Sequence, residues 1–110
     1  MKYHQNLTLA KWQKLSLIEQ MANVGSEILR TISWRNKNRK YSRLAFERAL
    51  ELLNLTLADS KNKKRLKEIA RAREMLADYF VFDNEYSSTE KFWQKYFLAF
   101  NWAARDNLSQ

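Results

Sequence analysis

Cysteine and proline are absent from this chain of 110 residues, and glycine occurs only once. Without cysteine there is no disulfide, no thiol nucleophile and no zinc finger. The single histidine, His4, argues against a Ser-His-Asp triad. Sheet proteins need many tight turns built from glycine, Asn-Gly and proline, so neither a β-sandwich nor a β-barrel is expected. A glycine-rich phosphate loop is excluded because the chain has only one glycine.

Long hydrophobic runs are missing as well. No apolar stretch approaches the roughly 18 residues that a membrane-spanning helix needs, and the N-terminus lacks the apolar core of a secretory signal. Apolar residues nevertheless make up 45% of the chain and aromatic residues 14%, which is enough for a packed core. The sequence therefore predicts a single cytoplasmic domain over residues 1–110, without a membrane partner.

The periodicity of the apolar residues predicts four amphipathic helices. The first starts either near Thr8 or at Ser16, where Ser16 and Glu19 have the spacing of a capping box, and it ends near Arg35. The other three are predicted over residues 41–58, 63–82 and 88–105.

Polar loops join these helices, and a second capping box at Ser87 and Glu90 precedes the last one. Short loops place consecutive helices antiparallel to one another. The expected fold is therefore an all-α protein, an antiparallel up-down-up-down four-helix bundle.

Five apolar residues fall outside the core-facing stripes. Single exposed apolar residues are common on any protein surface, but several patches on several helices suggest that another molecule covers them. A homo-oligomer is expected on this ground, with scattered surface residues as the alternative. The candidate contact residues are Trp34, Leu44, Leu55, Leu98 and Trp102.

Two residues inside the helices are unusual for their positions. Arg73 falls in the middle of an apolar stripe, where an arginine must be paired or must extend to solvent. It is interpreted as a structural ion pair, an extended side chain or an oligomer contact, or alternatively as an anion site inside the bundle. Gly25 lies mid-helix at a cost of about 1 kcal/mol relative to alanine, which indicates a close approach of another helix.

The chain is basic, with 20 lysine and arginine residues against 12 acidic ones and a net charge of +8. Two basic clusters surround the first and second predicted turns, which lie at opposite ends of an up-and-down bundle. Clustered cations on a chain with a pI near 9.9 are typical of proteins that bind the phosphate backbone of RNA or DNA. The candidate nucleic-acid contacts are Arg30, Arg35, Lys37, Arg39, Lys40 and Arg43 in the first cluster and Lys61, Lys63, Lys64, Arg65 and Lys67 in the second.

An enzymatic alternative rests on two carboxylate pairs with i,i+4 spacing, Glu47 with Glu51 and Glu74 with Asp78. Oxygen ligands on facing helices can hold Mg²⁺, as in helical nucleotide pyrophosphohydrolases. Arginines three or four residues from these acids instead suggest surface ion pairs. We therefore predict no catalytic residue, no metal ligand, no cofactor and no small-molecule substrate.

The segments 19–28 (EQMANVGSEI) and 46–52 (FERALEL) resemble the helical proteins encoded in ribosomal-RNA intervening sequences. The basic helical chain is also similar to the accessory proteins of diversity-generating retroelements. The resemblance covers roughly residues 16–82. It implies a four-helix bundle, often pentameric, with nucleic acid as partner and no enzymatic activity.

The sequence thus favours a non-enzymatic, self-associating binding protein whose basic helix ends contact RNA or DNA. The alternative is a scaffold protein that acts only through protein–protein contacts.

Overall fold

The computed structural model describes residues 9–108, and every regular element within that range is a helix. The elements are α1 (Leu9–Gln13), α2 (Leu17–Trp34), α3 (Arg39–Leu57), the 3-10 helix η1 (Ser60–Arg65), α4 (Leu66–Phe80) and α5 (Glu90–Leu108). The predicted all-α class is confirmed for this part of the chain.

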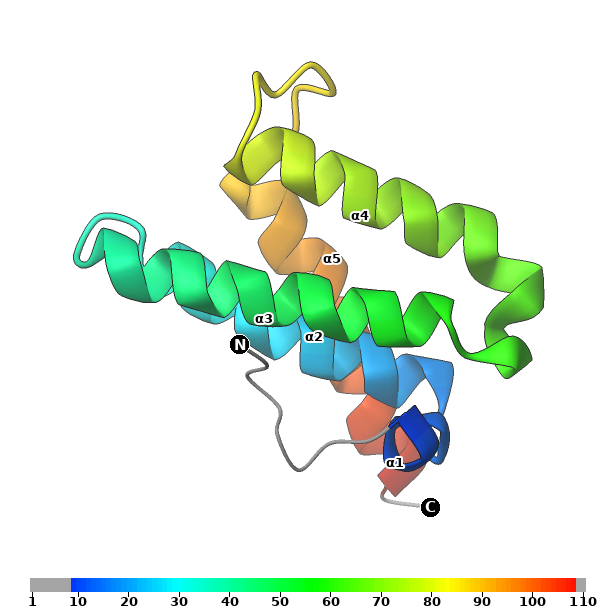
Figure 1. The fold of residues 1–110 in the computed structure, drawn as a ribbon. Helices are drawn as coiled ribbons and strands as arrows, with labels where there is room; N and C mark the ends of the chain where they lie inside the picture. Colours follow the sequence, from blue (N-terminus) through cyan, green and yellow to red (C-terminus); the bar gives the residue numbers. More distant parts are fainter. Residues whose placement is uncertain (1–8, 109–110) are drawn as a thin grey trace.

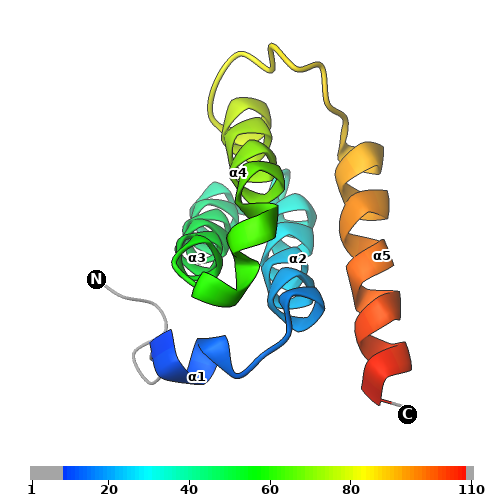
Figure 2. The same ribbon diagram turned by 90° about the vertical axis from the view of Figure 1, so that its right-hand side faces the viewer.

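The helices run in two main directions. α2 and α3 form an antiparallel pair, and α4 folds back over this pair after η1 has reversed the chain (Figure 1). α5 departs from this pattern, because it runs steeply across α2 on the side opposite α3 (Figure 2). The predicted antiparallel up-down-up-down four-helix topology is therefore not confirmed.

The first predicted helix is two helices, separated at Lys14–Ser16. The capping box at Ser16 is confirmed as the start of α2: the Ser16 hydroxyl accepts the Glu19 N–H at 3.1 Å, and the Glu19 carboxylate accepts the Ser16 N–H at 3.0 Å. The hydrogen bond from the Ser16 backbone lowers the pKa of Glu19. Thr8 and His4 lie outside the described residues.

The start of the third predicted helix is wrong, because residues 60–65 form the 3-10 helix η1 and the α-helix begins only at Leu66. Asp59 caps η1, since its carboxylate accepts the N–H of Lys61 at 3.1 Å. A capped 3-10 turn lets the chain reverse direction without glycine or proline.

The cap predicted for the last helix is also wrong. Thr89 caps α5, because its hydroxyl accepts the N–H of Phe92 at 3.1 Å. Ser87 has a φ of 53°, which is left-handed and unlike the extended backbone of an N-cap residue. Phe92, in the first turn of α5, is exposed, whereas its neighbour Trp93 is buried.

Gly25 on α2 lies directly against Phe97 on α5. A Cβ atom at Gly25 would be 2.8 Å from the Cβ of Phe97, which is closer than two carbon atoms can pack. The close helix approach predicted for Gly25 is confirmed. The absent side chain lets the aromatic face of α5 sit on α2.

A buried hydrogen-bonded network joins α1, α2, α3 and η1. The amide of Gln20 donates to the Trp12 carbonyl at 2.9 Å and to the Asp59 carboxylate at 2.8 Å, and it accepts from Asn62 at 2.9 Å. Trp12 donates its indole N–H to the Thr56 hydroxyl at 3.1 Å. All five side chains are buried, so the network fixes the short α1 and the turn at η1 against the long helices.

Candidate nucleic-acid interface

Four cations of the first predicted cluster line one cleft beside the turn between α2 and α3. We call this the basic cleft; its volume is about 770 Å³. Among the described residues, its lining contains Arg35, Lys37, Arg39 and Arg43 and no acidic side chain. The apolar wall includes Phe46 and Phe80, whose ring centroids lie 5.1 Å apart.

Arg35 is held in place by the end of α4. Its guanidinium donates to the Tyr79 hydroxyl at 2.8 Å, and its Cζ lies 4.8 Å from the centroid of the Tyr79 ring and 5.2 Å from that of Phe80. These contacts join the C-terminal ends of α2 and α4. Arg35 therefore has a positional role in the cleft as well as a charge.

The other three cations of the basic cleft are exposed. Within residues 9–108, neither Lys37, Arg39 nor Arg43 forms an ion pair with a carboxylate. Their charge is thus not neutralised by the part of the chain that the structure describes. Such a concentration of cations favours an anionic ligand.

The two remaining members of the first cluster lie elsewhere. Arg30 pairs with Glu27 at 3.1 Å, and the same carboxylate binds Arg48 at 2.9 Å. Lys40 is exposed but does not line the basic cleft. The structure therefore brings together four of the six residues predicted for this cluster.

The second predicted cluster is more strongly paired. Lys61 binds the Asp59 carboxylate and donates to the Gln13 carbonyl at 3.2 Å, and Arg65 pairs with Glu68 at 3.2 Å. The remaining lysines of the cluster are exposed: Lys63, Lys64 and Lys67.

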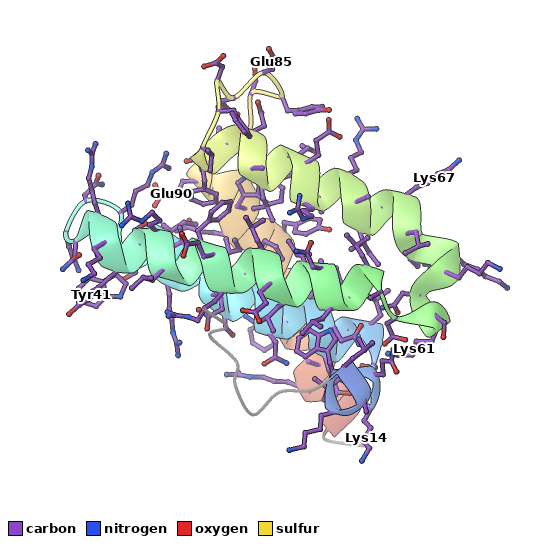
Figure 3. The ribbon with its side chains drawn as sticks, in the orientation of Figure 1. Lys14, Tyr41, Lys61, Lys67, Glu85 and Glu90 are labelled. Atoms are coloured by element: carbon purple, nitrogen blue, oxygen red, sulfur yellow. The ribbon has the colours of Figure 1, made fainter. Side chains whose placement is uncertain are left out.

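The two basic clusters lie at opposite ends of the α2–α3 pair. In Figure 3, Tyr41 marks the end with the basic cleft, and Lys61 and Lys67 mark the other end. One copy of the chain therefore does not present both clusters on one continuous surface. This agrees with the prediction from the sequence, which placed the two turns at opposite ends.

The predicted oligomer contacts differ in exposure. Trp34, Leu98 and Trp102 are 39%, 48% and 56% exposed. Trp34 packs edge-to-face on Tyr41, with 5.1 Å between the ring centroids. Leu44 and Leu55 are half-buried. Leu55 packs on the core cluster, so its burial within one copy of the chain explains it better than an oligomer contact does.

A second cleft, of about 790 Å³, lies between α3, α4 and the loop before α5. We call it the acidic cleft, because Glu74, Asp78, Asp83 and Glu85 line it. Leu57, Ala70, Ala77, Phe82 and Tyr86 supply its apolar surface.

Asp78 builds the wall of the acidic cleft. Its two carboxylate oxygens accept the N–H groups of Glu85 at 2.8 Å and of Tyr86 at 3.0 Å. Glu74 accepts a hydrogen bond from the Tyr86 hydroxyl and raises the pKa of Tyr86 above its ordinary 10.0. Asp83 and Glu85 are exposed, and Glu85 projects from the tip of the loop in Figure 3.

Arg73 is not in the interior of a helical bundle, which corrects the anion-site alternative. It is only partly buried, lines the acidic cleft and donates from Nε to the Asn54 side chain at 2.9 Å. An arginine that reaches the edge of its helix in this way avoids the cost of burying a charge.

The predicted carboxylate pairs do not line one cavity. Glu74 and Asp78 line the acidic cleft, whereas Glu47 and Glu51 do not. Within residues 9–108, no group of three or more His, Cys, Asp and Glu residues could hold a metal ion. Both oxygens of Asp78 already accept backbone hydrogen bonds.

The sequence did not single out the aromatic residues of the two clefts. Tyr79 and Phe80 pack on the core cluster and also hold Arg35. Phe82 is 71% exposed in the loop before α5. In the sequence, an aromatic residue stands next to an acidic one twice in this loop, at Phe82-Asp83 and at Glu85-Tyr86. This pattern was the signal that could have indicated the acidic cleft.

No model of a known protein family, no curated protein and no solved structure matches this chain. The resemblance to intervening-sequence and retroelement accessory proteins therefore remains a prediction. No helix among residues 9–108 is long and apolar enough to cross a bilayer.

Proposed function

We propose that this chain is a non-enzymatic protein that binds the phosphate backbone of RNA or DNA in its basic cleft. The observation that carries the proposal is the composition of the cleft: four cations and no acidic residue among the described lining residues. Each phosphate contact releases counterions from the nucleic acid, and this release dominates backbone binding.

The geometry of the cations supports contacts to phosphate rather than to base edges. Arg35 is already oriented by Tyr79 and Phe80, and arginine binds phosphate oxygens through two parallel hydrogen bonds. Lys37, Arg39 and Arg43 surround the same cleft from the turn and from α3. Phosphate contacts carry no sequence information by themselves, so we expect binding with little sequence preference.

The protein is proposed to act as a homo-oligomer. A single basic cleft offers few phosphate contacts, and several copies would place several clefts along one strand, which raises avidity without any new contact. The exposed Trp34, Leu98 and Trp102 support self-association. A cytoplasmic setting gives such a protein access to RNA.

Charge reversal inside the cleft tests the proposal, with a matched reversal at the other end of the molecule as control. The cleft variant is Arg39→Glu with Arg43→Glu. Arg39 is the first residue of α3, where an acidic residue stabilises the helix, so the variant is expected to fold. The control is Lys63→Glu with Lys64→Glu, two exposed residues of η1 with the same change in net charge.

Binding of fluorescently labelled mixed-sequence RNA and DNA would be measured by anisotropy at low salt. The cleft variant should lose at least tenfold in affinity, and the control variant should lose clearly less. Equal losses in both variants would show that only net charge matters, and unchanged affinity in the cleft variant would favour the scaffold alternative.

A further inference from the structure

The outer face of α5 carries an exposed apolar pair between cations. α5 lies on the flank of α2, away from α3 (Figure 2). Trp93 and Phe97 are buried, with Phe97 against α2, whereas Leu98 and Trp102 are exposed. Residues spaced by four and three positions share one face of a helix. The outer face, which we call the α5 ridge, is Lys91, Lys95, Leu98, Trp102 and Arg105, with the acidic Asp106 beside Arg105 at its end.

The ridge is basic and has a rigid aromatic residue near its end. Lys91 and Lys95 are exposed, and the Cζ of Arg105 lies 5.6 Å from the centroid of the Trp102 ring. A tryptophan flanked by arginine is the kind of residue that anchors protein interfaces. Such a ridge fits a partner surface that is apolar at its centre and acidic at its edge.

The acidic cleft has these properties. Phe82 and Tyr86 are exposed aromatic residues on its wall, and the Asp83 and Glu85 carboxylates lie on the exposed loop beside them. Its volume of about 790 Å³ is in the range of pockets that enclose a drug-sized ligand, so an indole side chain fits inside.

We propose that the α5 ridge of one copy docks in the acidic cleft of a second copy, with Trp102 inserted beside Phe82 and Tyr86. Lys95 and the other ridge cations then face Asp83 and Glu85. The inference rests on the self-association proposed above and not on nucleic-acid binding.

Charge complementarity selects this occupant. The chain as a whole has a net charge of +8, yet this cleft is lined by four acidic residues and one arginine. A symmetric pairing of two α5 ridges would place lysines and arginines of both copies close together, and like charges across an interface oppose association.

The resulting contact is head-to-tail. The acidic cleft is built by α3, α4 and the loop, whereas the ridge belongs to α5 on the opposite flank of α2. Each copy therefore uses one surface as donor and a different one as acceptor. Such heterologous contacts produce a ring when the rotation closes and a filament when it does not.

Two variants separate the two surfaces. The ridge variant is Lys95→Glu with Trp102→Ser, and the cleft-loop variant is Asp83→Lys with Glu85→Lys. All four residues are exposed, so folding is expected to survive, and circular dichroism checks this. Lys64→Glu, on exposed η1, is the control for a change of charge.

Sedimentation velocity at increasing concentration gives the result. The wild type and the control should associate at micromolar concentrations, and each variant alone should stay monomeric. An equimolar mixture of the two variants should form a 1:1 heterodimer, because each supplies the surface that the other lacks.

Three results would overturn the inference. The first is a wild type that stays monomeric, which also removes the proposed self-association. The second is a mixture that stays monomeric, and the third is a cleft-loop variant that still associates by itself. The second and third leave self-association and nucleic-acid binding in place and refute only this pair of surfaces.

Discussion

Gly25 and Phe97 bring α2 and α5 into direct contact: a Cβ atom at position 25 would lie 2.8 Å from the Cβ of Phe97. The neighbouring atoms belong to the start of the Phe97 side chain, which cannot rotate away, so a larger residue at position 25 must push α5 outward. The place of α5, and with it the exposure of its ridge, depends on this contact.

Gly25→Ala is expected to destabilise the protein. Overpacking costs about 1–3 kcal/mol, and alanine returns about 1 kcal/mol through its helix propensity, so a net loss of up to about 2 kcal/mol is expected in urea unfolding. Ser26→Ala, at an exposed position of the same helix, should change stability little. An increase in stability at position 25 would mean that α5 is free to move.

Gln20→Met should be more damaging, because it removes the centre of the buried network while keeping the side-chain volume. The Trp12 carbonyl, the Asp59 carboxylate and the Asn62 amide each lose a partner. Each of these three groups keeps another hydrogen bond, from the Leu15 N–H, from Lys61 and to the Thr56 carbonyl, respectively. The expected cost is therefore that of three lost hydrogen bonds at about 0.5–1.5 kcal/mol each, or about 1.5–4.5 kcal/mol in total. The exposed Gln94→Met is the control, and a loss as small as in this control would contradict the structural role of the network.

The sequence predicted the helices where apolar periodicity was strong and failed where local hydrogen bonds decide. The stripe of α2 and the Ser16 cap follow from local spacing. The 3-10 turn at η1 depends on Gln20, which lies 39 residues before Asp59 in the chain, so no local pattern reveals it.

The direction of α5 and the two clefts were also beyond the sequence. α5 crosses α2 because Phe97 fits against a glycine, and helical periodicity specifies a buried face but not a crossing angle. The basic cluster could be read from Arg35 to Arg43, yet its organisation as a cleft depends on Tyr79 and Phe80 of α4.

Stability should fall in acid through Asp59. Burial raises the pKa of this carboxyl, but hydrogen bonds from Lys61 and Gln20 and the charge of Lys61 outweigh it and hold the pKa below its ordinary 3.8. The unfolded chain then takes up a proton more readily than the folded one. The contribution of the Asp59 carboxylate to the free energy of unfolding is therefore fully present above about pH 4–5, and it is lost as the pH falls through the folded-state pKa.

Urea unfolding between about pH 7 and pH 2 measures this effect. Asp59→Asn lowers stability at neutral pH but removes this group's proton uptake, so the variant should lose less stability on acidification than the wild type. Parallel pH profiles for the two proteins would refute the assignment to Asp59.

Asp78→Ala should loosen the loop before α5 without unfolding the protein. The N–H groups of Glu85 and Tyr86 lose their acceptor, which costs about 1–3 kcal/mol, and the acidic cleft loses a wall. Amide hydrogen exchange should accelerate at these two residues, and self-association should weaken. Asp83→Ala, in the same loop, is the control for exchange, and unchanged protection in Asp78→Ala would contradict the bracing role of Asp78.

The salt dependence of nucleic-acid binding tests the central claim most directly. Log affinity falls by about 0.9 for each neutralised phosphate per decade of salt on duplex DNA, so four cations in the basic cleft predict a slope of about −3 to −4. Arg39→Glu with Arg43→Glu should bring this slope about two units closer to zero, and Lys63→Glu with Lys64→Glu should leave it nearly unchanged. A slope that both pairs of substitutions change equally, or a wild-type slope near zero, would contradict the basic cleft as the binding site.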